Sequence, residues 1–258
     1  MNLPKISVVI PSFNKGKRIE ETLKSIFKQK YPNLEVIVMD GGSNDETLSI
    51  LKKYKQRHKS QLIWVSKSDN GQLDAVNKGL RKATGDILTF INADDVYRDG
   101  VFDLVSDNFS KNPKSLWFAG KSIVINENGK EIAPFVTWYK NILFSLNKYN
   151  FLLVANYLMQ PSVFLTKNAY QKYGPFTGTK DFIMEYDLWL KIGNKEMPKI
   201  INKEISKFRI EKDTKTKTMS RKILKEDQKI VKKYTSNIFL LFAHSFHNIL
   251  RVFVGYFI

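Results

Sequence analysis

The first 91 residues alternate short apolar segments with segments of helical periodicity. Apolar runs rich in β-branched residues occur at residues 6–10, 34–40, 62–65 and 86–91. Between them, apolar side chains recur at the spacing of amphipathic helices over residues 18–30, 41–54 and 74–84. Strands that are separated by helices tend to pair in parallel and to be covered on both faces. The pattern therefore predicts an α/β fold, with a Rossmann-like, mostly parallel sheet flanked by helices.

Acidic side chains follow two of these predicted strands. Asp40 ends the second strand, and Asp94 and Asp95 come shortly after the fourth. Because ligands of open α/β sheets bind at the carboxyl ends of the strands, we expect the three carboxylates to share one crevice. The alternatives are a solvated turn at Asp94 and Asp95 and, for Asp40, a cap on the turn at Gly41 and Gly42.

The paired aspartates also suggest a metal ion. Two neighbouring ionised carboxylates repel one another, and a hard divalent cation relieves that repulsion. Mg²⁺ and Mn²⁺ are commonly held by one or two carboxylates together with the phosphates of a substrate. The chain has no cysteine, which excludes disulfides and thiolate metal sites. Asp94 and Asp95 therefore predict a Mn²⁺ or Mg²⁺ site for a phosphate-bearing ligand.

Several separated motifs resemble the nucleotide-binding half of family 2 glycosyltransferases. They are ISVVIPSFNKGKRIEETLKSIFKQKYPNLEVIVMDGGSNDET, from residue 6, and SDNGQLDAVNKGLRKATGDILTFINADDVY, from residue 68. A looser resemblance continues in MQPSVFLTKNAYQKYGPF and FIMEYDLWLKI, to about residue 210. The resemblance implies a GT-A fold over residues 1–210 and an inverting transfer of a sugar from a nucleotide-sugar donor, with a UDP-sugar favoured.

The resemblance assigns nucleotide contacts to residues at the strand ends. The family's opening nucleotide-contacting loop matches Pro11, Ser12, Phe13 and Asn14. Asp40 matches the carboxylate that meets the base, where an acceptor oxygen can take the N3–H of uracil or thymine. Asp69 matches the loop that closes over the nucleoside, although the Asn-Gly that follows it is also a turn signal.

The family's DxD-type position falls on Asn92, Asp94 and Asp95. Because its first residue is Asn rather than Asp, the ribose and metal contacts are assigned to Asp94 and Asp95, with Asp95 as the direct metal ligand. Nearby polar residues have structural explanations. Asp45 is expected to cap the following helix, and Asp74 and Asn77 to start and pack the next one.

Inverting transfer needs a carboxylate that takes the proton of the acceptor hydroxyl. Glu185 and Asp187 are two residues apart, so on one helix they point in nearly opposite directions. Glu185 shares its face with apolar residues, namely Leu188, Trp189 and Ile192, whereas Asp187 shares a face with Lys191 and Asn194. The spacing predicts a buried Glu185 and a solvated Asp187.

The resemblance also favours Glu185 as the catalytic base. Many relatives read EDYDLWL here, and Glu185 falls on the first Asp of that motif, one methylene longer. Asp187 is the second candidate and Asp181 a weaker one, while a helix-capping role is the alternative for Glu185. Gln160 is expected to line the acceptor side.

The last part of the chain is basic and then apolar. The formal charge is +17, and residues 202–233 hold twelve Lys or Arg against five Asp or Glu. Residues 237–258 are apolar with a polar stripe at helical spacing: His244, Ser245, His247, Asn248 and Arg251. We therefore expect residues 211–258 to form a basic linker and an amphipathic helix that binds an anionic membrane surface. Packing on the domain or homodimer formation is the alternative.

The sequence also suggests a cellular location and leaves two alternative functions open. The N-terminus lacks the pattern of a secretory signal, so a cytoplasmic protein at the inner face of the membrane is expected. The resemblance suggests a glycan or lipid-linked acceptor in envelope polysaccharide synthesis. A sugar-phosphate nucleotidyltransferase is one alternative, but it normally needs a glycine-rich basic loop that PSFNKGKR supplies only in part. A basic nucleic-acid- or membrane-binding protein without catalysis is another, and the acidic crevice argues against nucleic acid.

Overall fold

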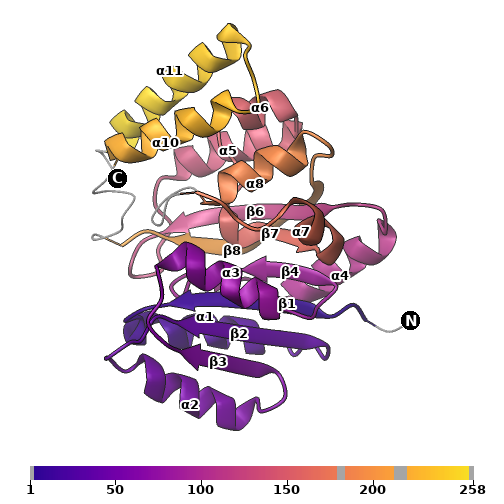
Figure 1. The fold of residues 1–258 in the computed structure, drawn as a ribbon, viewed down its shortest axis with the longest axis vertical. Coiled ribbons are helices and arrows are strands. Elements are labelled where there is room, and N and C mark those ends of the chain that lie inside the picture. Colours follow the sequence, from indigo (N-terminus) through magenta and orange to yellow (C-terminus); the bar gives the residue numbers. More distant parts are fainter. Residues whose placement is uncertain (1–2, 179–183, 212–219, 256–258) are drawn as a thin grey trace.

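The computed structural model describes residues 3–178, 184–211 and 220–255, with one sheet at its centre (Figure 1). Within these residues, eight strands pair in the order β3-β2-β1-β4-β7-β6-β8-β5. The first four strands are β1 (Ile6–Ser12), β2 (Leu34–Asp40), β3 (Leu62–Ser66) and β4 (Ile87–Phe90). They are mutually parallel where they pair, as the sequence predicts.

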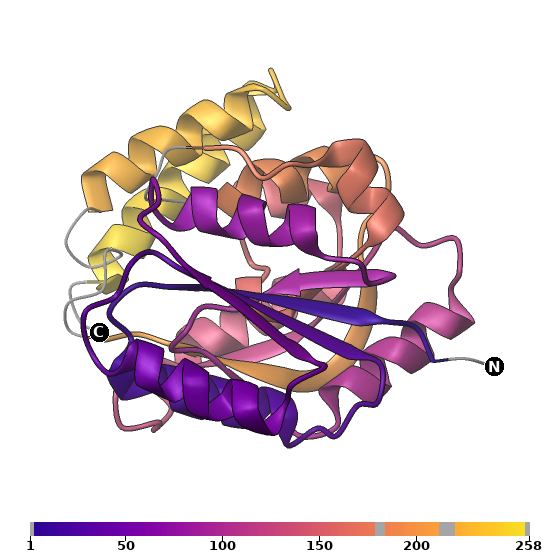
Figure 2. The ribbon, with the colours of Figure 1, turned by 60° about the horizontal axis from the view of Figure 1, so that its bottom comes forward.

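Three helices cover the two faces of these strands (Figure 2). They are α1 (Gly16–Phe27), α2 (Thr47–Arg57) and α3 (Gln72–Lys82). Alternate residues of a strand point to opposite faces, so Val8 packs with α1 and α2 whereas Val9 packs with α3. Gly79 lets α3 approach closely, because a Cβ there would lie 2.4 Å from Cγ1 of Val9. The predicted helices are confirmed.

The register places the carboxyl ends of three strands in one line. Ser12 pairs with Asp40 across β1 and β2, and Asp40 pairs with Ser66 across β2 and β3. The loops after these strands therefore begin side by side. This alignment sets the position of the site.

The second half of the chain extends the sheet. Its strands are β5 (Val96–Tyr97), β6 (Trp117–Ile125), β7 (Val163–Thr166) and β8 (Lys199–Arg209). β7 lies antiparallel between β4 and β6, and β8 runs parallel to β6. Helix α4 (Val101–Lys111) packs on this half. Four of the seven strand pairs are parallel, so the mostly parallel sheet is confirmed.

One segment differs from what its apolar pattern predicts. Residues 129–136 look like a strand that pairs with residues 116–126, but only a single bridge joins Ile125 to Glu131. Pro134 then begins helix α5 (Pro134–Leu146). Proline is well tolerated in the first turn of a helix, where its missing N–H has no intrahelical partner to lose. Helix α5 therefore takes the place of the last part of the strand that the pattern predicts.

The remaining helices are α6 (Tyr149–Val154), the short η1 (Gln160–Ser162), α7 (Lys167–Tyr173), α8 (Met184–Gly193), α10 (Ser220–Lys232) and α11 (Ile238–Gly255). Of these, α6 and α8 lie above β6 in Figure 1, α10 and α11 lie farther out, and α7 lies beside β7. Ile230 and Val231 of α10 belong to the same core cluster as Trp189 of α8. α11 lies against α6, as the hydrogen bond between Nδ1 of His244 and the Val154 carbonyl shows. The C-terminal helices thus pack on the domain.

The polar stripe of α11 has the opposite orientation to the one expected from the sequence. His244 and Asn248 are buried, at 1% and 5% exposure. Arg251 forms an ion pair of 2.7 Å with Asp227 of α10. The stripe faces the domain because these partners lie there. In the part of the chain that the structure describes, each helix is too short or too polar to span a bilayer.

Candidate active site

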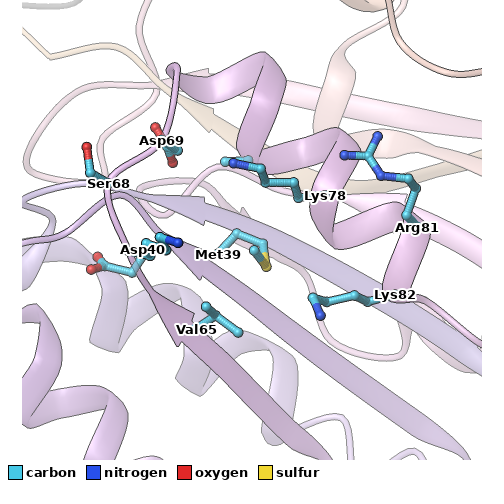
Figure 3. A pocket seen from close by; sticks show the side chains of 10 residues that line it. Met39, Asp40, Val65, Ser68, Asp69, Lys78, Arg81 and Lys82 are labelled. Carbon is cyan, nitrogen blue, oxygen red and sulfur yellow. The ribbon is translucent and has the colours of Figure 1, made fainter.

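A cavity of about 430 Å³ opens at the ends of β2 and β3, beside α3 (Figure 3). Asp40 and Asp69 line its strand-end side. Three cations of α3 line the other side, namely Lys78, Arg81 and Lys82. Lys78 also pairs with Asp74 at 2.6 Å, as expected for a residue that stabilises the first turns of that helix. The cavity thus combines hydrogen-bond acceptors with a cationic wall.

Asp40 is held by the turn that follows it. Its Oδ2 accepts hydrogen bonds from the backbone N–H groups of Gly42 and Ser43 and from the hydroxyl of Ser66, at 3.1, 2.9 and 2.6 Å. Its Oδ1 accepts from the Ser43 hydroxyl at 2.5 Å. These bonds show the capping role that the sequence left open. The contact with a nucleotide base stays a prediction, supported by the place of Asp40 in the cavity wall.

Asp69 brings the loop after β3 against the turn after β2. Its Oδ1 accepts from the N–H of Gly71 at 2.8 Å. A Cβ at Gly41 would lie 3.2 Å from its Oδ2, so the glycine lets this carboxylate approach the turn closely. Asp40 and Asp69 therefore meet at one edge of the sheet. The cavity lining does not include Asp94 or Asp95, so the single crevice expected for the three strand-end carboxylates stays a prediction.

The loop after β1 is fixed to the loop after β2. The backbone N–H of Asn14 donates to the Ser43 hydroxyl at 2.8 Å, and its side chain accepts from the N–H of Asn44 at 3.0 Å. Asn14 has a φ of +50°, which asparagine tolerates better than most residues. Phe13 presents its ring to solvent, with 60% exposure. Ser12 is buried, and its hydroxyl has no hydrogen-bond partner among the described residues.

Asp94 forms an ion pair with a lysine of the loop after β1. The Lys15 ammonium forms an ion pair with Oδ2 of Asp94, whose side chain keeps 13% of its surface exposed. Glu211 lies 3.8 Å from the same ammonium. Burial lowers the pKa of Lys15, but the charge and hydrogen bond of Asp94, together with the charges of Glu211 and Asp95, outweigh it, so the pKa is raised. Sequence reasoning missed Lys15, although it directly follows the predicted nucleotide loop.

Asp95 points into the protein. It is fully buried, and its two oxygens accept from the backbone N–H of Arg209 at 2.8 Å and from the Asn92 amide at 3.1 Å. Asn92 in turn accepts from Gln72 at 2.6 Å. Burial, and next the charge of Asp94, raise the pKa of Asp95 well above its ordinary value. The metal contact assigned to Asp95 stays a prediction, and the geometry favours Asp94 instead.

Arg209, the last residue of β8, fastens the segment that carries both aspartates. Its Nε donates to the Asp94 carbonyl at 2.8 Å. Its Nη1 donates to the carbonyls of Asn126 and Glu127, and its Nη2 pairs with Glu21 at 2.7 Å. The sequence gives no local signal for this role, because the partners are distant in the chain.

Replacing Arg209 by Met is expected to lower the free energy of unfolding by about 3 kcal/mol, because buried carbonyl groups lose their donors. Urea denaturation followed by circular dichroism measures this loss. Arg98 provides a matched control, since its ion pair with Glu204 is about 40% exposed on both sides, at 42% and 41%. Arg98→Met should cost less than about 1 kcal/mol. Equal losses of unfolding free energy in the two variants would contradict the role of Arg209 in holding the segment of Asp94 and Asp95.

Glu185 and Asp187 occupy opposite faces of α8. Leu188, Trp189 and Ile192 are buried on the Glu185 side, which confirms the predicted face. Glu185 is half-buried, and this burial raises its pKa, as does the nearby Asp227 to a smaller extent, while Lys140 opposes the shift. Within the described residues, no hydrogen bond or ion pair links Glu185 to the aspartates after β4.

Asp187 is not solvated, contrary to the sequence interpretation. Its carboxylate accepts from the Thr177 hydroxyl at 2.7 Å and forms an ion pair with Lys233 at 3.1 Å. Only 13% of its side-chain surface is exposed, because the end of α10 covers this part of α8. Asp181 lies outside the described residues. Gln160 is buried and donates to the Phe90 carbonyl at 2.6 Å, so it supports the end of β4.

Comparison with known proteins finds glycosyltransferases. The family model described as Glycosyl transferase family 2 matches residues 7–174. An uncharacterized glycosyltransferase of Rickettsia conorii is 29% identical over 220 residues, which cover 84% of this chain and 34% of that protein. The poly-beta-1,6-N-acetyl-D-glucosamine synthase of Staphylococcus epidermidis is 28% identical over 109 residues, which cover 42% of this chain and 26% of the synthase. The chain thus spans only about a third or less of these relatives.

Solved structures share the fold. The mannosyltransferase from Pyrobaculum calidifontis, in complex with GDP-Man and Mn²⁺, has a TM-score of 0.71 at 19% identity, covering 99% of this chain and 74% of that one. TarS 1-349 of S. aureus in complex with UDP-GlcNAc has a TM-score of 0.59 at 18% identity, covering 89% and 71%. These likenesses confirm the GT-A fold expected from the sequence. Because the family model covers more than half of the chain, from β1 to α7, the chain belongs to glycosyl transferase family 2.

Proposed function

We propose that the chain transfers a sugar, with inversion, from a nucleotide-sugar donor to a hydroxyl group of a glycan or lipid-linked acceptor in cell-envelope polysaccharide synthesis. A UDP-sugar is the favoured donor. The observation that carries the proposal is the alignment of Ser12, Asp40 and Ser66 at one edge of the sheet, next to a cavity lined by Asp40 and Asp69. The relatives that bind GDP-Man or UDP-GlcNAc support it.

The donor nucleoside would sit in the cavity between the loops after β2 and β3. Asp40 and Asp69 offer acceptor oxygens there, which suit the N–H of a pyrimidine base. The exposed ring of Phe13 offers a face for stacking, on a loop that Ser43 holds next to Asp40. The base would therefore be recognised by both hydrogen bonds and stacking.

The residues at the end of β4 fit a cation that arrives with the donor. Among the described residues, no group of three or more acidic or histidine side chains could hold a metal ion alone. Asp94 is a partly accessible carboxylate that already contacts a positive charge, that of Lys15. One carboxylate and two phosphates suit Mn²⁺ or Mg²⁺. When bound, the ion would neutralise the charge of the leaving diphosphate.

The chain's own residues would then complete the site. Lys15, displaced from Asp94, would direct its ammonium toward the diphosphate. Asp95 and Arg209 hold the backbone of Asp94 in place through their hydrogen bonds. Glu185 would accept the proton of the acceptor hydroxyl, and burial suits this task by raising its pKa. Asp187, the second candidate, is already engaged by Thr177 and Lys233.

The proposal predicts slow hydrolysis of a nucleotide sugar that depends on a divalent cation. Purified protein is incubated with UDP-glucose, UDP-GlcNAc or GDP-mannose and Mn²⁺, and nucleotide release is measured. EDTA should lower the rate by at least about 100-fold, and excess Mn²⁺ should restore it. Equal rates with chelator and with metal would remove the cation from the proposal.

A second assay distinguishes the proposed transferase from the alternative enzyme. A sugar-phosphate nucleotidyltransferase would release pyrophosphate from UTP and glucose 1-phosphate, which the proposed transferase cannot do. Pyrophosphate release without nucleotide-sugar hydrolysis would overturn the proposed function.

A further inference from the structure

Helix α11 turns its apolar side away from the protein. Its exposed side chains are between 47% and 82% accessible: Ile238, Phe239, Phe242, Phe246, Ile249 and Leu250. Single exposed apolar residues are ordinary, but a contiguous group on one helix marks an interaction site. The three phenylalanines make this face strongly apolar.

Buried polar contacts fix the rotation of α11 about its axis. Nδ1 of His244 lies 3.0 Å from the Val154 carbonyl, and Nε2 lies 2.9 Å from the Asn248 amide. Arg251 pairs with the buried Asp227 at 2.7 Å. Turning the phenylalanines inward would break these bonds and leave buried polar groups without partners, which is costly. The outward apolar face is therefore built into the fold.

A second helix beside α11, α5, also exposes apolar side chains. The ring of Tyr139 in α5 stacks with that of His247 in α11, with centroids 5.8 Å apart. α5 carries its own exposed apolar stripe at helical spacing: Phe135, Trp138, Ile142 and Leu146. Tryptophan is enriched where an apolar surface meets water, as at a membrane interface. Two neighbouring helices thus present apolar residues to the outside.

The charge of the surroundings indicates what covers this face. α10 packs against α11 and exposes Lys225, Lys229 and Lys232. The whole chain carries a formal charge of +17, so two copies brought face to face would repel one another. An anionic lipid leaflet attracts the same charge, and each nearby lysine adds to the binding.

We propose that the exposed face of α11 docks on the surface of an anionic lipid bilayer, with the helix lying in the plane of the interface. Phe239, Phe242 and Phe246 would enter the boundary between head groups and acyl chains, and the lysines of α10 would contact lipid phosphates. The binding itself does not depend on the proposed activity. Its consequence, a site held close to lipid-linked acceptors, rests on the proposed function.

Co-sedimentation with vesicles tests the docking. The full chain is mixed with vesicles of phosphatidylcholine containing phosphatidylglycerol, or with phosphatidylcholine alone. We expect binding to the anionic vesicles that weakens with added salt, and binding at least about tenfold weaker without the anionic lipid. The double substitution Phe242→Asp with Phe246→Asp should weaken binding to anionic vesicles by at least about tenfold.

A matched double variant controls for the added negative charge. Leu3 and Ile63 are each 45% exposed. Leu3 lies near the N-terminus, before β1, and Ile63 lies in β3, both far from α11 (Figure 1). Leu3→Asp with Ile63→Asp should keep vesicle binding within about threefold of the wild type, since it changes charge but not the docking face. Circular dichroism and soluble nucleotide-sugar hydrolysis should match the wild type in both variants, which separates this test from a failure of the proposed function.

Three results would overturn the inference. The first is the absence of wild-type binding to anionic vesicles at low salt, and the second is an equal loss of binding in the two double variants. The third is a dimer in sedimentation equilibrium that Phe242→Asp with Phe246→Asp dissolves, without any vesicle binding by the wild type. That outcome would assign the face to a second copy of the chain.

Discussion

Asp94→Ala is expected to reduce metal-dependent turnover of the donor by about 10³-fold, because the carboxylate that would share a cation with the diphosphate is removed. Stability should change little. Asp94 keeps some exposed surface, and the bond from Arg209 goes to its backbone carbonyl, which alanine retains. Isothermal titration of UDP with and without Mn²⁺ provides a second readout, in which the variant should lose the Mn²⁺-dependent gain in affinity.

The neighbouring aspartate provides the comparison. Asp95→Asn keeps the shape of the side chain but places an amide among donors from Arg209 and Asn92. Its main effect should be a lower melting temperature, with metal-dependent UDP binding retained by the folded protein. If Asp95→Asn instead abolishes that binding at an unchanged melting temperature, the metal contact belongs to Asp95, as the sequence interpretation assigns it.

Glu185→Gln is expected to lower kcat for sugar transfer by about 10³-fold while the affinity for donor stays the same, because glutamine cannot accept a proton. The pH profile gives an independent check. A general base works only when deprotonated, so activity should fall as the pH drops through the pKa of Glu185. Burial raises that pKa above its ordinary value of 4.5, and the acid limb should be displaced upward accordingly.

Asp187→Asn serves as the control on the same helix. It weakens the contacts with Thr177 and Lys233, so it should loosen the attachment of α10 and lower the melting temperature. We expect kcat to fall less than about tenfold. A variant of Asp187 without activity, next to an active Glu185→Gln, would move the base to Asp187.

The first half of the fold can be predicted from the sequence because its signals are local. β1 to β4 are short β-branched runs, and α1 to α3 repeat apolar residues at helical spacing. The second half lacks such signals. β8, with the sequence KIINKEISKFR, is rich in charge and joins the sheet through pairing with β6, a contact between distant parts of the chain. Pattern alone gives no register for such a strand.

The site shows the same division. Strand-end carboxylates can be found in the sequence, because a parallel sheet gathers the ends of its strands at one edge. The partners that distinguish Asp94 from Asp95 cannot, since Lys15 is 79 residues away from Asp94 and Arg209 is 114 residues away from Asp95. Helical periodicity likewise separates the two faces of α11 without showing that His244 and Asn248 face inward.

The contacts of Arg209 also have a consequence for folding during synthesis on the ribosome. Asp94 and Asp95 are translated more than a hundred residues before Arg209, so β1 to β4 can pair while the segment that carries both aspartates still lacks the hydrogen bonds of that arginine. Domains generally fold as units while synthesis proceeds from the N-terminus. A chain that ended before β8 would therefore lack the hydrogen bonds that hold this segment, and under the proposed function its position for the cation would form only once β8 has joined the sheet.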